Sequence, residues 1–247
     1  MPTNTVPSPS SSTERLFTPC KLRRLVVGVP WLADLGTQEV DALLDASELR
    51  ALAPREWLFR QQTPADWLHI VISGATRLVR VTGVGRTATI RCVERGGTLG
   101  ELSMVSSAGV YLYSSQALLP THLLSIPAPL CRDIMDRQPT CRAEFMSRLA
   151  LELTDRLEDL AQLTQGDAMS RLIGYVLRQL PSHRSKAPRV IRLTIPKRWL
   201  AAQLSMSPET LSRLLAKLRD SGAINIDQQR LTVLDEQKLR EFMMTDG

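Results

Sequence analysis

The sequence lacks any long hydrophobic run. No stretch of about twenty apolar residues occurs along its 247 positions, and residues 1–12 are polar and proline-rich, without the basic start and apolar core of a secretory signal. We therefore expect a cytoplasmic protein that does not enter a membrane. An apolar content of 43% favours packed domains over disorder.

Cysteine and histidine are scarce and scattered. Cys20, Cys92, Cys131 and Cys141 include no pair at the spacing of a zinc knuckle or a redox motif, so buried reduced thiols are the simplest interpretation. Glycine-rich phosphate loops, nucleophile elbows and metal triads are also missing, so we do not expect an enzyme. The three histidines, which are more often structural than ligands, are His69, His122 and His183.

Positive charge is confined to the last third of the chain. Residues 1–165 hold 17 Lys and Arg against 17 Asp and Glu, whereas residues 166–247 hold 14 against 8. A basic C-terminal segment on a neutral body is typical of a module that binds phosphates, although a basic solvated face has the same composition.

Hydrophobic patterning separates an N-terminal β region from a long helix. Apolar residues at helical spacing predict a short helix within residues 31–49. From residue 52 to residue 127 short apolar runs alternate with glycine and proline, which predicts an antiparallel β-roll or barrel.

Residues 129–165 carry an apolar ladder with steps of three and four, which predicts a helix of about 36 Å over about 24 residues. The ladder fits two arrangements. The helix either pairs with the same helix of a second chain, making a homodimer, or packs on its own β-roll. The predicted dimer seam consists of Met146, Leu149, Leu153, Leu157 and Leu160.

Residues 196–234 contain two short amphipathic patterns joined by three residues. Ser207 is a good N-cap, and Pro208 suits the first position of the second helix. Two helices joined so tightly form a helix-turn-helix. Gly222 ends the second helix, and residues 223–234 predict a β-hairpin, which makes the unit winged. The apolar positions are Trp199, Leu200 and Leu204 in the first pattern and Leu211, Leu214, Leu215 and Leu218 in the second.

The second helix of such a unit enters the major groove N-terminus first, so the residues opposite its leucines are the candidates for reading bases. Arginine can donate two bonds to guanine, glutamate can accept from the cytosine amino group, and serine or threonine can meet a base edge or a thymine methyl. The alternative is that Glu209 and Arg213 form an ordinary surface ion pair. The base-reading candidates are Glu209, Thr210, Ser212 and Arg213, and the phosphate candidates are Lys197, Arg198, Ser207 and Lys217.

Two segments, LFRQQTPADWLHIVISGATRLVR at 58–80 and IPKRWLAAQLSMSPETLSRLLAKLRDSGAI at 195–224, resemble the Crp/Fnr family of bacterial transcription regulators, and the resemblance extends from residue 31 to residue 242. It implies an α+β chain with an N-terminal cyclic-nucleotide-binding-type β-roll, a long dimerisation helix and a C-terminal winged helix-turn-helix. The expected divisions are a disordered tail at 1–20, a sensor domain at 21–128, the dimerisation helix at 129–165 and the DNA-binding domain at 166–247.

The run ETLSR at residues 209–213 is similar to the recognition helix of the Fnr branch. The resemblance implies double-stranded DNA as partner, with half-sites resembling TTGAT in an inverted repeat, where Arg213 reads a guanine, Glu209 the opposing cytosine side and Ser212 a thymine. It also implies an activator that contacts RNA polymerase and responds to a signal sensed in the β-roll.

Departures from the family pattern reduce the number of candidate signals. The cyclic AMP-binding members follow a Gly-Glu-Leu segment with an arginine that neutralises the cyclic phosphate, but residues 110–113 read VYLY, which argues against cyclic AMP. Only Cys20 lies near the start, and one thiolate cannot hold a four-iron cluster, which argues against an iron–sulfur sensor. The Gly-Glu-Leu segment and its neighbour give the predicted effector pocket of Gly100, Glu101, Leu102 and Ser103.

The remaining resemblance is to the dissimilatory nitrate-respiration regulators, which implies haem-dependent sensing of nitric oxide with His69 or His122 as the haem ligand. The alternative is a cyclic nucleotide or another small organic ligand beside Glu101 and Ser103. The sequence leaves the cofactor open.

Overall fold

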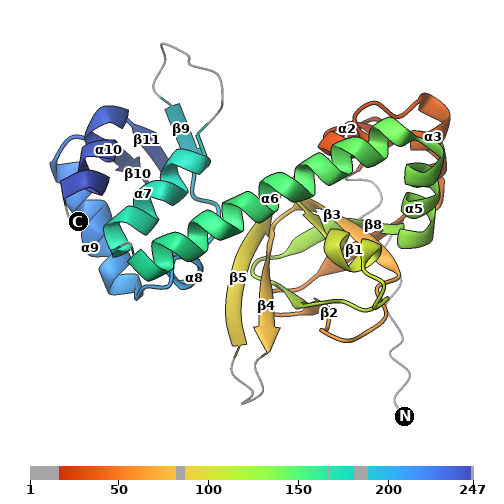
Figure 1. Cartoon of the computed structure of the whole chain (residues 1–247), viewed down its shortest axis with the longest axis horizontal. Coiled ribbons are helices and arrows are strands. Elements are labelled where there is room, and N and C mark those ends of the chain that lie inside the picture. Colours follow the sequence, from red (N-terminus) through yellow and green to blue (C-terminus); the bar gives the residue numbers. More distant parts are fainter. Residues whose placement is uncertain (1–16, 82–86, 166, 181–188, 246–247) are drawn as a thin grey trace. The chain divides into compact units, whose positions relative to one another are not determined.

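The computed structural model describes residues 17–81, 87–165, 167–180 and 189–245, with the backbone alone at 87, 158–165 and 244–245 (Figure 1). The chain forms two compact units, residues 1–150 and 151–247. No helix in the described ranges is long and apolar enough to cross a membrane.

In the described part of the chain, two helices and a short 3₁₀ turn precede the first strand. They are α2 (Pro19–Val27), η1 (Pro30–Leu32) and α3 (Thr37–Asp45). The tail predicted at 1–20 is wrong at its end, because α2 begins at Pro19 and the Phe17 ring lies 5.3 Å from the His122 ring. The helix predicted within 31–49 is confirmed for α3 only, since the chain is already extended from Glu48. Proline at the first turn and burial of Val26 explain why α2 forms.

The N-terminal unit is built on two four-stranded antiparallel sheets, which confirms the predicted β-roll. The first has the order β1-β8-β3-β6 and the second the order β2-β7-β4-β5. The short helix α4 (Glu101–Val105) lies between β6 and β7. The strands are β1 (Glu48–Leu52), β2 (Trp57–Phe59), β3 (Trp67–Ser73), β4 (Ala75–Val81), β5 (Thr87–Glu94), β6 (Thr98–Leu99), β7 (Ser114–Ala117) and β8 (Thr121–Pro127).

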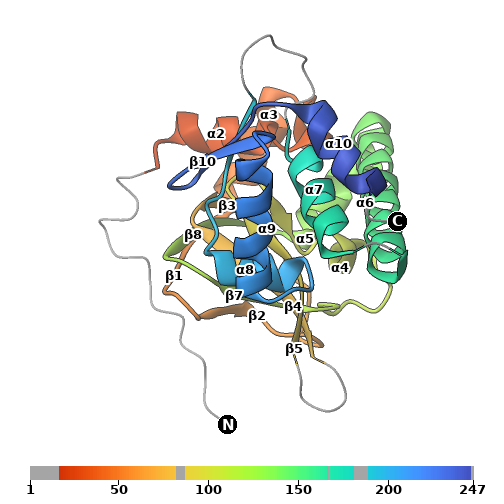
Figure 2. The same cartoon turned by 90° about the vertical axis from the view of Figure 1, so that its left-hand side faces the viewer.

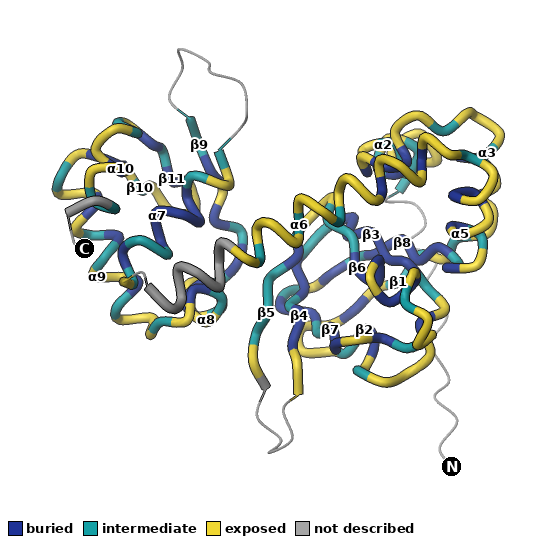
Figure 3. The backbone as a smooth tube through the Cα atoms, in the orientation of Figure 1, coloured by how far each residue is buried: buried dark blue, intermediate teal, exposed yellow. Residues whose placement is uncertain are grey.

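Strand β3 is buried on both faces, as its dark colour in Figure 3 shows. Leu68 and Ile70 point to the core shared with the helices, whereas Val71 points to the core between the two sheets. This alternation is the period-two geometry of a strand. It places His69 on the inter-sheet side, next to Phe59.

The segment 129–165 holds two helices rather than the single one expected. α5 (Ala128–Arg137) ends before Gln138, and α6 (Pro139–Gln165) follows. Gln138 has φ −119° and ψ 89°, as expected for a residue whose α conformation is disfavoured by a following proline.

The start of α6 packs on its own unit. Cys141 and Phe145 are buried, Phe145 meets Trp31 edge-on at 5.1 Å between ring centroids, and Leu149 is half-buried against the same core. Packing on the β-roll unit, one of the two arrangements considered for this helix, thus holds for its first turns.

Further along α6 the ladder is exposed. Met146, Leu153 and Leu157 are 60%, 61% and 58% exposed, and yellow dominates this stretch in Figure 3. Leu160 lies outside the side chains that the structure describes.

The cysteines differ in environment. Cys131 and Cys141 are buried and Cys92 is half-buried, and burial raises the pKa of the Cys92 and Cys131 thiols to about 12. Cys20 is exposed, so the interpretation of every cysteine as buried is wrong there.

The C-terminal unit combines helices with a three-stranded antiparallel sheet of order β10-β11-β9 (Figure 2). Asp167 caps α7 by accepting a 2.7 Å hydrogen bond from the Ser170 amide. The hairpin expected at 223–234 is confirmed as β10 and β11. The elements are α7 (Ala168–Arg178), β9 (Arg189–Arg192), α8 (Lys197–Gln203), α9 (Pro208–Asp220), β10 (Ile224–Asp227), β11 (Arg230–Val233) and α10 (Glu236–Thr245).

Candidate nucleic-acid interface

Local sequence fixes both ends of α9. The Ser207 hydroxyl accepts a 3.1 Å hydrogen bond from the Thr210 amide, and Pro208 occupies the first turn, where its missing N–H costs nothing. At the other end Gly222, with φ +75°, lets its own amide bond to the Arg219 carbonyl and the Ala223 amide to that of Leu218. This pair of bonds is a Schellman motif, so α9 has the predicted boundaries.

The two faces of α9 differ sharply. Leu211, Leu215 and Leu218 are buried in the unit, whereas Leu214 is half-buried. Glu209, Ser212 and Arg213 are exposed, and Thr210 is half-buried beside the cap. The helix is thus anchored by its leucines and presents the base-reading candidates, apart from Thr210, to solvent.

The connection between α8 and α9 is held from a third helix. Arg171 of α7 donates from Nε to the Leu204 carbonyl at 2.9 Å and from Nη2 to the Ser205 carbonyl at 3.3 Å. Ser205 has φ +52°, so the turn uses a left-handed residue without glycine. Arg171 therefore positions α9, a role that sequence reasoning missed because the contact spans more than thirty residues.

Glu209 is held in its charged form. Its own backbone amide and the Ser207 hydroxyl donate hydrogen bonds to the carboxylate and lower its pKa. The carboxylate is therefore an acceptor at neutral pH, as reading a cytosine amino group requires.

The alternative of a Glu209–Arg213 surface ion pair finds no support. Both side chains lie in the described part of the chain, and there no ion pair joins them within 4.0 Å. The Arg213 guanidinium consequently remains available to an external acceptor.

The phosphate candidates lie in three different surroundings. Lys197 and Arg198 are exposed at the start of α8, and the Arg198 guanidinium lies 5.1 Å from the Trp199 ring. The Lys217 ammonium is 5.5 Å from the Phe242 ring of α10. The Ser207 hydroxyl is already engaged as the cap of α9, so a phosphate role would have to compete with that bond.

The sheet adds two cations that sequence reasoning did not single out. Arg192 of β9 and Arg230 of β11 are cross-strand partners, and both side chains are exposed. Like charges directly opposite each other destabilise a sheet, so an external anion would relieve the pair. Their pairing depends on strand register, which the sequence alone did not reveal.

The predicted effector residues are largely engaged within the protein. Gly100 has φ +98°, and a Cβ there would come 2.8 Å from the Trp67 carbonyl oxygen. The buried Glu101 accepts a hydrogen bond from Thr98, and the Ser103 hydroxyl accepts one from the Leu112 amide at 3.2 Å. Leu102 is exposed. None of the four lines the pocket of about 470 Å³ found in the β-roll unit.

His69 is buried and satisfied at both nitrogens. Nδ1 lies 2.8 Å from the Ser125 hydroxyl and Nε2 lies 3.1 Å from the Tyr111 hydroxyl. Tyr111 donates its only hydroxyl proton to the Trp67 carbonyl at 2.9 Å, so His69 must donate from Nε2 and accept at Nδ1. Burial, with a smaller effect of Arg50, lowers the pKa of His69 to about 3. The ring is therefore neutral.

His69 does not fit the role of a haem ligand, whereas His122 is hydrogen-bonded at one ring nitrogen only. His69 has no free lone pair, and ligation would break its bonds in the core. His122 bonds through Nδ1 to the Ser73 hydroxyl at 3.0 Å, its ring centroid lies 5.3 Å from that of Phe17, and it is not among the residues that line the pocket. Among the described residues, no group of three or more His, Cys, Asp or Glu could hold a metal ion.

Two family models match the chain. Residues 49–138 match the cyclic nucleotide-binding domain, and residues 170–242 match the Crp-like helix-turn-helix domain. The first covers the β-roll from β1 to α5 and its junction with α6, and the second covers α7 to α10.

Three similar proteins each match more than two thirds of this chain. A global nitrogen regulator of Synechocystis sp. is 25% identical over 71% of this chain and 80% of its own length. The transcriptional activator protein anr of Pseudomonas aeruginosa is 23% identical over 77% of this chain and 78% of its own. The structure of FixK2 from Bradyrhizobium japonicum has the same fold, with a TM-score of 0.67, 18% identity and coverage of 79% of this chain and 96% of that one. The chain is not an enzyme but a DNA-binding transcription regulator, and it belongs to the Crp/Fnr family.

Proposed function

We propose that this regulator binds, as a homodimer, an inverted repeat of TTGAT-like half-sites, with α9 in the major groove of each half-site. The observation that carries the proposal is the exposed start of α9, where Glu209, Ser212 and Arg213 face solvent on a helix anchored by buried leucines. Activation through RNA polymerase is part of the proposal, and the similarity to a protein named as a transcriptional activator supports it.

The proposed contacts follow from donor and acceptor geometry. Arg213 donates two hydrogen bonds to a guanine, Glu209 accepts from the cytosine side, and Ser212 meets a thymine. Thr210, half-buried beside the cap, takes a peripheral base contact. Residues four apart lie about 6 Å apart along a helix, so Glu209 and Arg213 reach neighbouring base pairs.

Phosphate contacts fix the register of α9 without selecting sequence. We assign them to Lys197 and Arg198 at the exposed start of α8, with Ser207 and Lys217 beside them and Arg192 and Arg230 on the sheet. The excess of basic residues in this third of the chain supports the assignment.

The homodimer uses the exposed ladder of α6. Met146, Leu153 and Leu157 repeat at the spacing of a helix seam, with Leu149 at its edge and Leu160 in continuation. Two recognition helices in such a dimer meet half-sites about 34 Å apart on one face of DNA. A signal in the β-roll then acts on DNA affinity through this helix.

A small organic ligand is the proposed signal. Haem ligation by His69 would break its bonds to the Ser125 and Tyr111 hydroxyls, and His122, bonded to Ser73 through Nδ1, lies outside the lining of the pocket. The pocket in the same unit is the feature that favours a ligand.

The test compares native protein with Arg213→Ala by fluorescence anisotropy on a duplex carrying the TTGAT inverted repeat, and on one whose central G·C pair is A·T in each half-site. Native protein should lose about tenfold to a hundredfold in affinity per altered half-site, because a bidentate contact is lost. Arg213→Ala should bind both duplexes equally.

Arg240→Ala is the matched control, since Arg240 is an exposed arginine of the same unit paired with Glu236 on α10. It should keep the native preference. The base-reading assignment fails if Arg213→Ala still discriminates the two duplexes, or if it weakens binding to specific and scrambled DNA by the same factor.

A further inference from the structure

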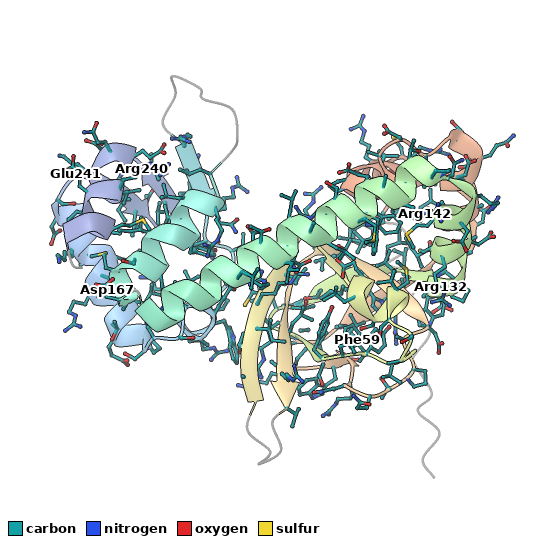
Figure 4. The ribbon with its side chains drawn as sticks, in the orientation of Figure 1. Phe59, Arg132, Arg142, Asp167, Arg240 and Glu241 are labelled. Carbon is teal, nitrogen blue, oxygen red and sulfur yellow. The ribbon has the colours of Figure 1, made fainter. Side chains whose placement is uncertain are left out.

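The β-roll unit contains a pocket of about 470 Å³ whose walls are aromatic and whose charges are positive. The walls come from Trp57, Phe59, Trp67 and Tyr111, and the charges from Arg50 and Arg60. The volume lies in the range of pockets that hold small organic molecules. Figure 4 labels Phe59 among the side chains of the β-roll.

The aromatic part of the pocket is rigid and flat. The rings of Phe59 and Tyr111 stack with centroids 3.7 Å apart and planes within 7°, and His69 stacks on Phe59 at 5.6 Å. Tyr111 is fixed by its bond to the Trp67 carbonyl, and His69 by its bond to Ser125. A preformed stack of this kind favours a planar apolar body.

The positive charge of the pocket lacks a carboxylate partner. Arg50 is half-buried on β1, and no ion pair or hydrogen bond of its guanidinium occurs in the described part of the chain. Arg60 is exposed, and its guanidinium lies over the Trp57 ring, 4.0 Å from the centroid, also without an acidic partner among the described residues. Two charges act on the Tyr111 hydroxyl, that of the Asp66 carboxylate and that of the Arg50 guanidinium.

His69 cannot supply further charge. Its ring is neutral, and the charge of Arg50 is one of the two influences on it. The anion-binding capacity of the pocket therefore rests on the two arginines, and guanidinium groups match the geometry of a carboxylate.

From this combination we infer that the pocket binds a small aromatic carboxylate, with its ring against the Trp57, Phe59 and Trp67 side chains and its carboxylate on Arg50 and Arg60. This inference deepens the proposed control by a small organic ligand, but it concerns the β-roll unit alone. Its test measures ligand binding directly, so it can fail while the DNA assignment stands.

Isothermal titration calorimetry of the full-length protein with 2-naphthoate and with the uncharged 2-naphthamide tests the inference. The two probes share the ring and differ in the charge. Native protein should bind 2-naphthoate about tenfold to a hundredfold more tightly than 2-naphthamide, because hydrogen bonds to a charged group are lost with the amide.

Variants then locate the charge. Arg50→Gln and Arg60→Gln should each weaken 2-naphthoate binding while 2-naphthamide binding stays within about twofold. Arg95→Gln is the control, because Arg95 is an exposed arginine of the same unit outside the pocket lining, and it should bind both probes like the native protein. Thermal unfolding of each variant checks that it is folded.

Four results would overturn the inference. Native protein could bind neither probe at millimolar concentration, or bind both equally. The arginine variants could leave 2-naphthoate binding unchanged, which would show that the two arginines do not hold the carboxylate. Arg95→Gln could weaken binding as much as Arg50→Gln, which would place the effect in the overall charge of the unit.

Discussion

Replacing Leu153 with Asp should separate the homodimer. Leu153 is 61% exposed in the single chain, and Met146 and Leu157 on the same ladder are exposed to a similar degree. Full burial of such a side chain contributes about 1.5–3 kcal/mol, so covering the remaining surface of each contributes about 1–2 kcal/mol. Six side chains, three from each protomer, contribute about 6–12 kcal/mol before the costs of association.

Leu153→Asp removes two of these six contributions and places two carboxylates in the seam. The loss of about 2–4 kcal/mol raises the dimer dissociation constant by about thirtyfold to several hundredfold. Sedimentation velocity over a range of protein concentrations measures this change directly.

Leu151→Asp is the matched control. Leu151 is 59% exposed, but two residues turn a helix by about 200°, so it lies on the side of α6 away from Leu153. This variant should sediment like the native protein. The seam assignment is refuted if native protein is monomeric throughout, if Leu153→Asp stays dimeric, or if Leu151→Asp dissociates equally.

Three further predictions concern the cap, the sheet and the buried histidine. Ser207→Ala should lower the unfolding free energy by about 1 kcal/mol in urea, because the cap of α9 is lost, whereas Ser212→Ala on the exposed face should leave it nearly unchanged. Arg192→Gln and Arg230→Gln should weaken binding to specific and scrambled DNA alike and reduce the salt dependence by about one counterion each; a sequence-dependent loss would contradict the phosphate role. The pKa of His69 is lowered to about 3, below the ordinary value of 6.5, so the unfolded chain binds more protons between these pH values and stability falls as the pH drops through them. Between pH 7 and pH 5 His69 should account for about 2 kcal/mol of that fall, and His69→Asn should remove it in denaturant titrations.

Sequence patterns predicted the elements whose signals are local. The limits of α9 follow from the Ser207 cap, Pro208 and the leucine spacing. Each of these features acts on residues within one or two helical turns. The short apolar runs between Gly and Pro likewise predicted the β-roll. These features depend on residues a few positions apart, which a pattern can capture.

Features made by distant residues were not predicted. Arg171 supports the turn before α9 through contacts to Leu204 and Ser205, and Arg192 faces Arg230 only because of strand register. The break before Pro139 had a local signal, the proline itself, but the long apolar ladder that follows outweighed it in the interpretation.

The distinction between local and distant contacts also explains why the effector site predicted from the motif differs from the pocket in the structure. Gly100 was chosen for its motif, yet its backbone packs against the Trp67 carbonyl and serves to shape the turn. Tyr111 follows it in the stretch where the cyclic AMP-binding members carry an arginine, and its neutral ring stacks on Phe59 instead of offering charge to a phosphate. Arg50 and Arg60, which have no ion-pair partner among the described residues, line the pocket beside that stack. A ligand that matches the site must therefore combine a flat apolar body with an anionic group at one end. A cyclic phosphate held by a single interior arginine does not require that combination.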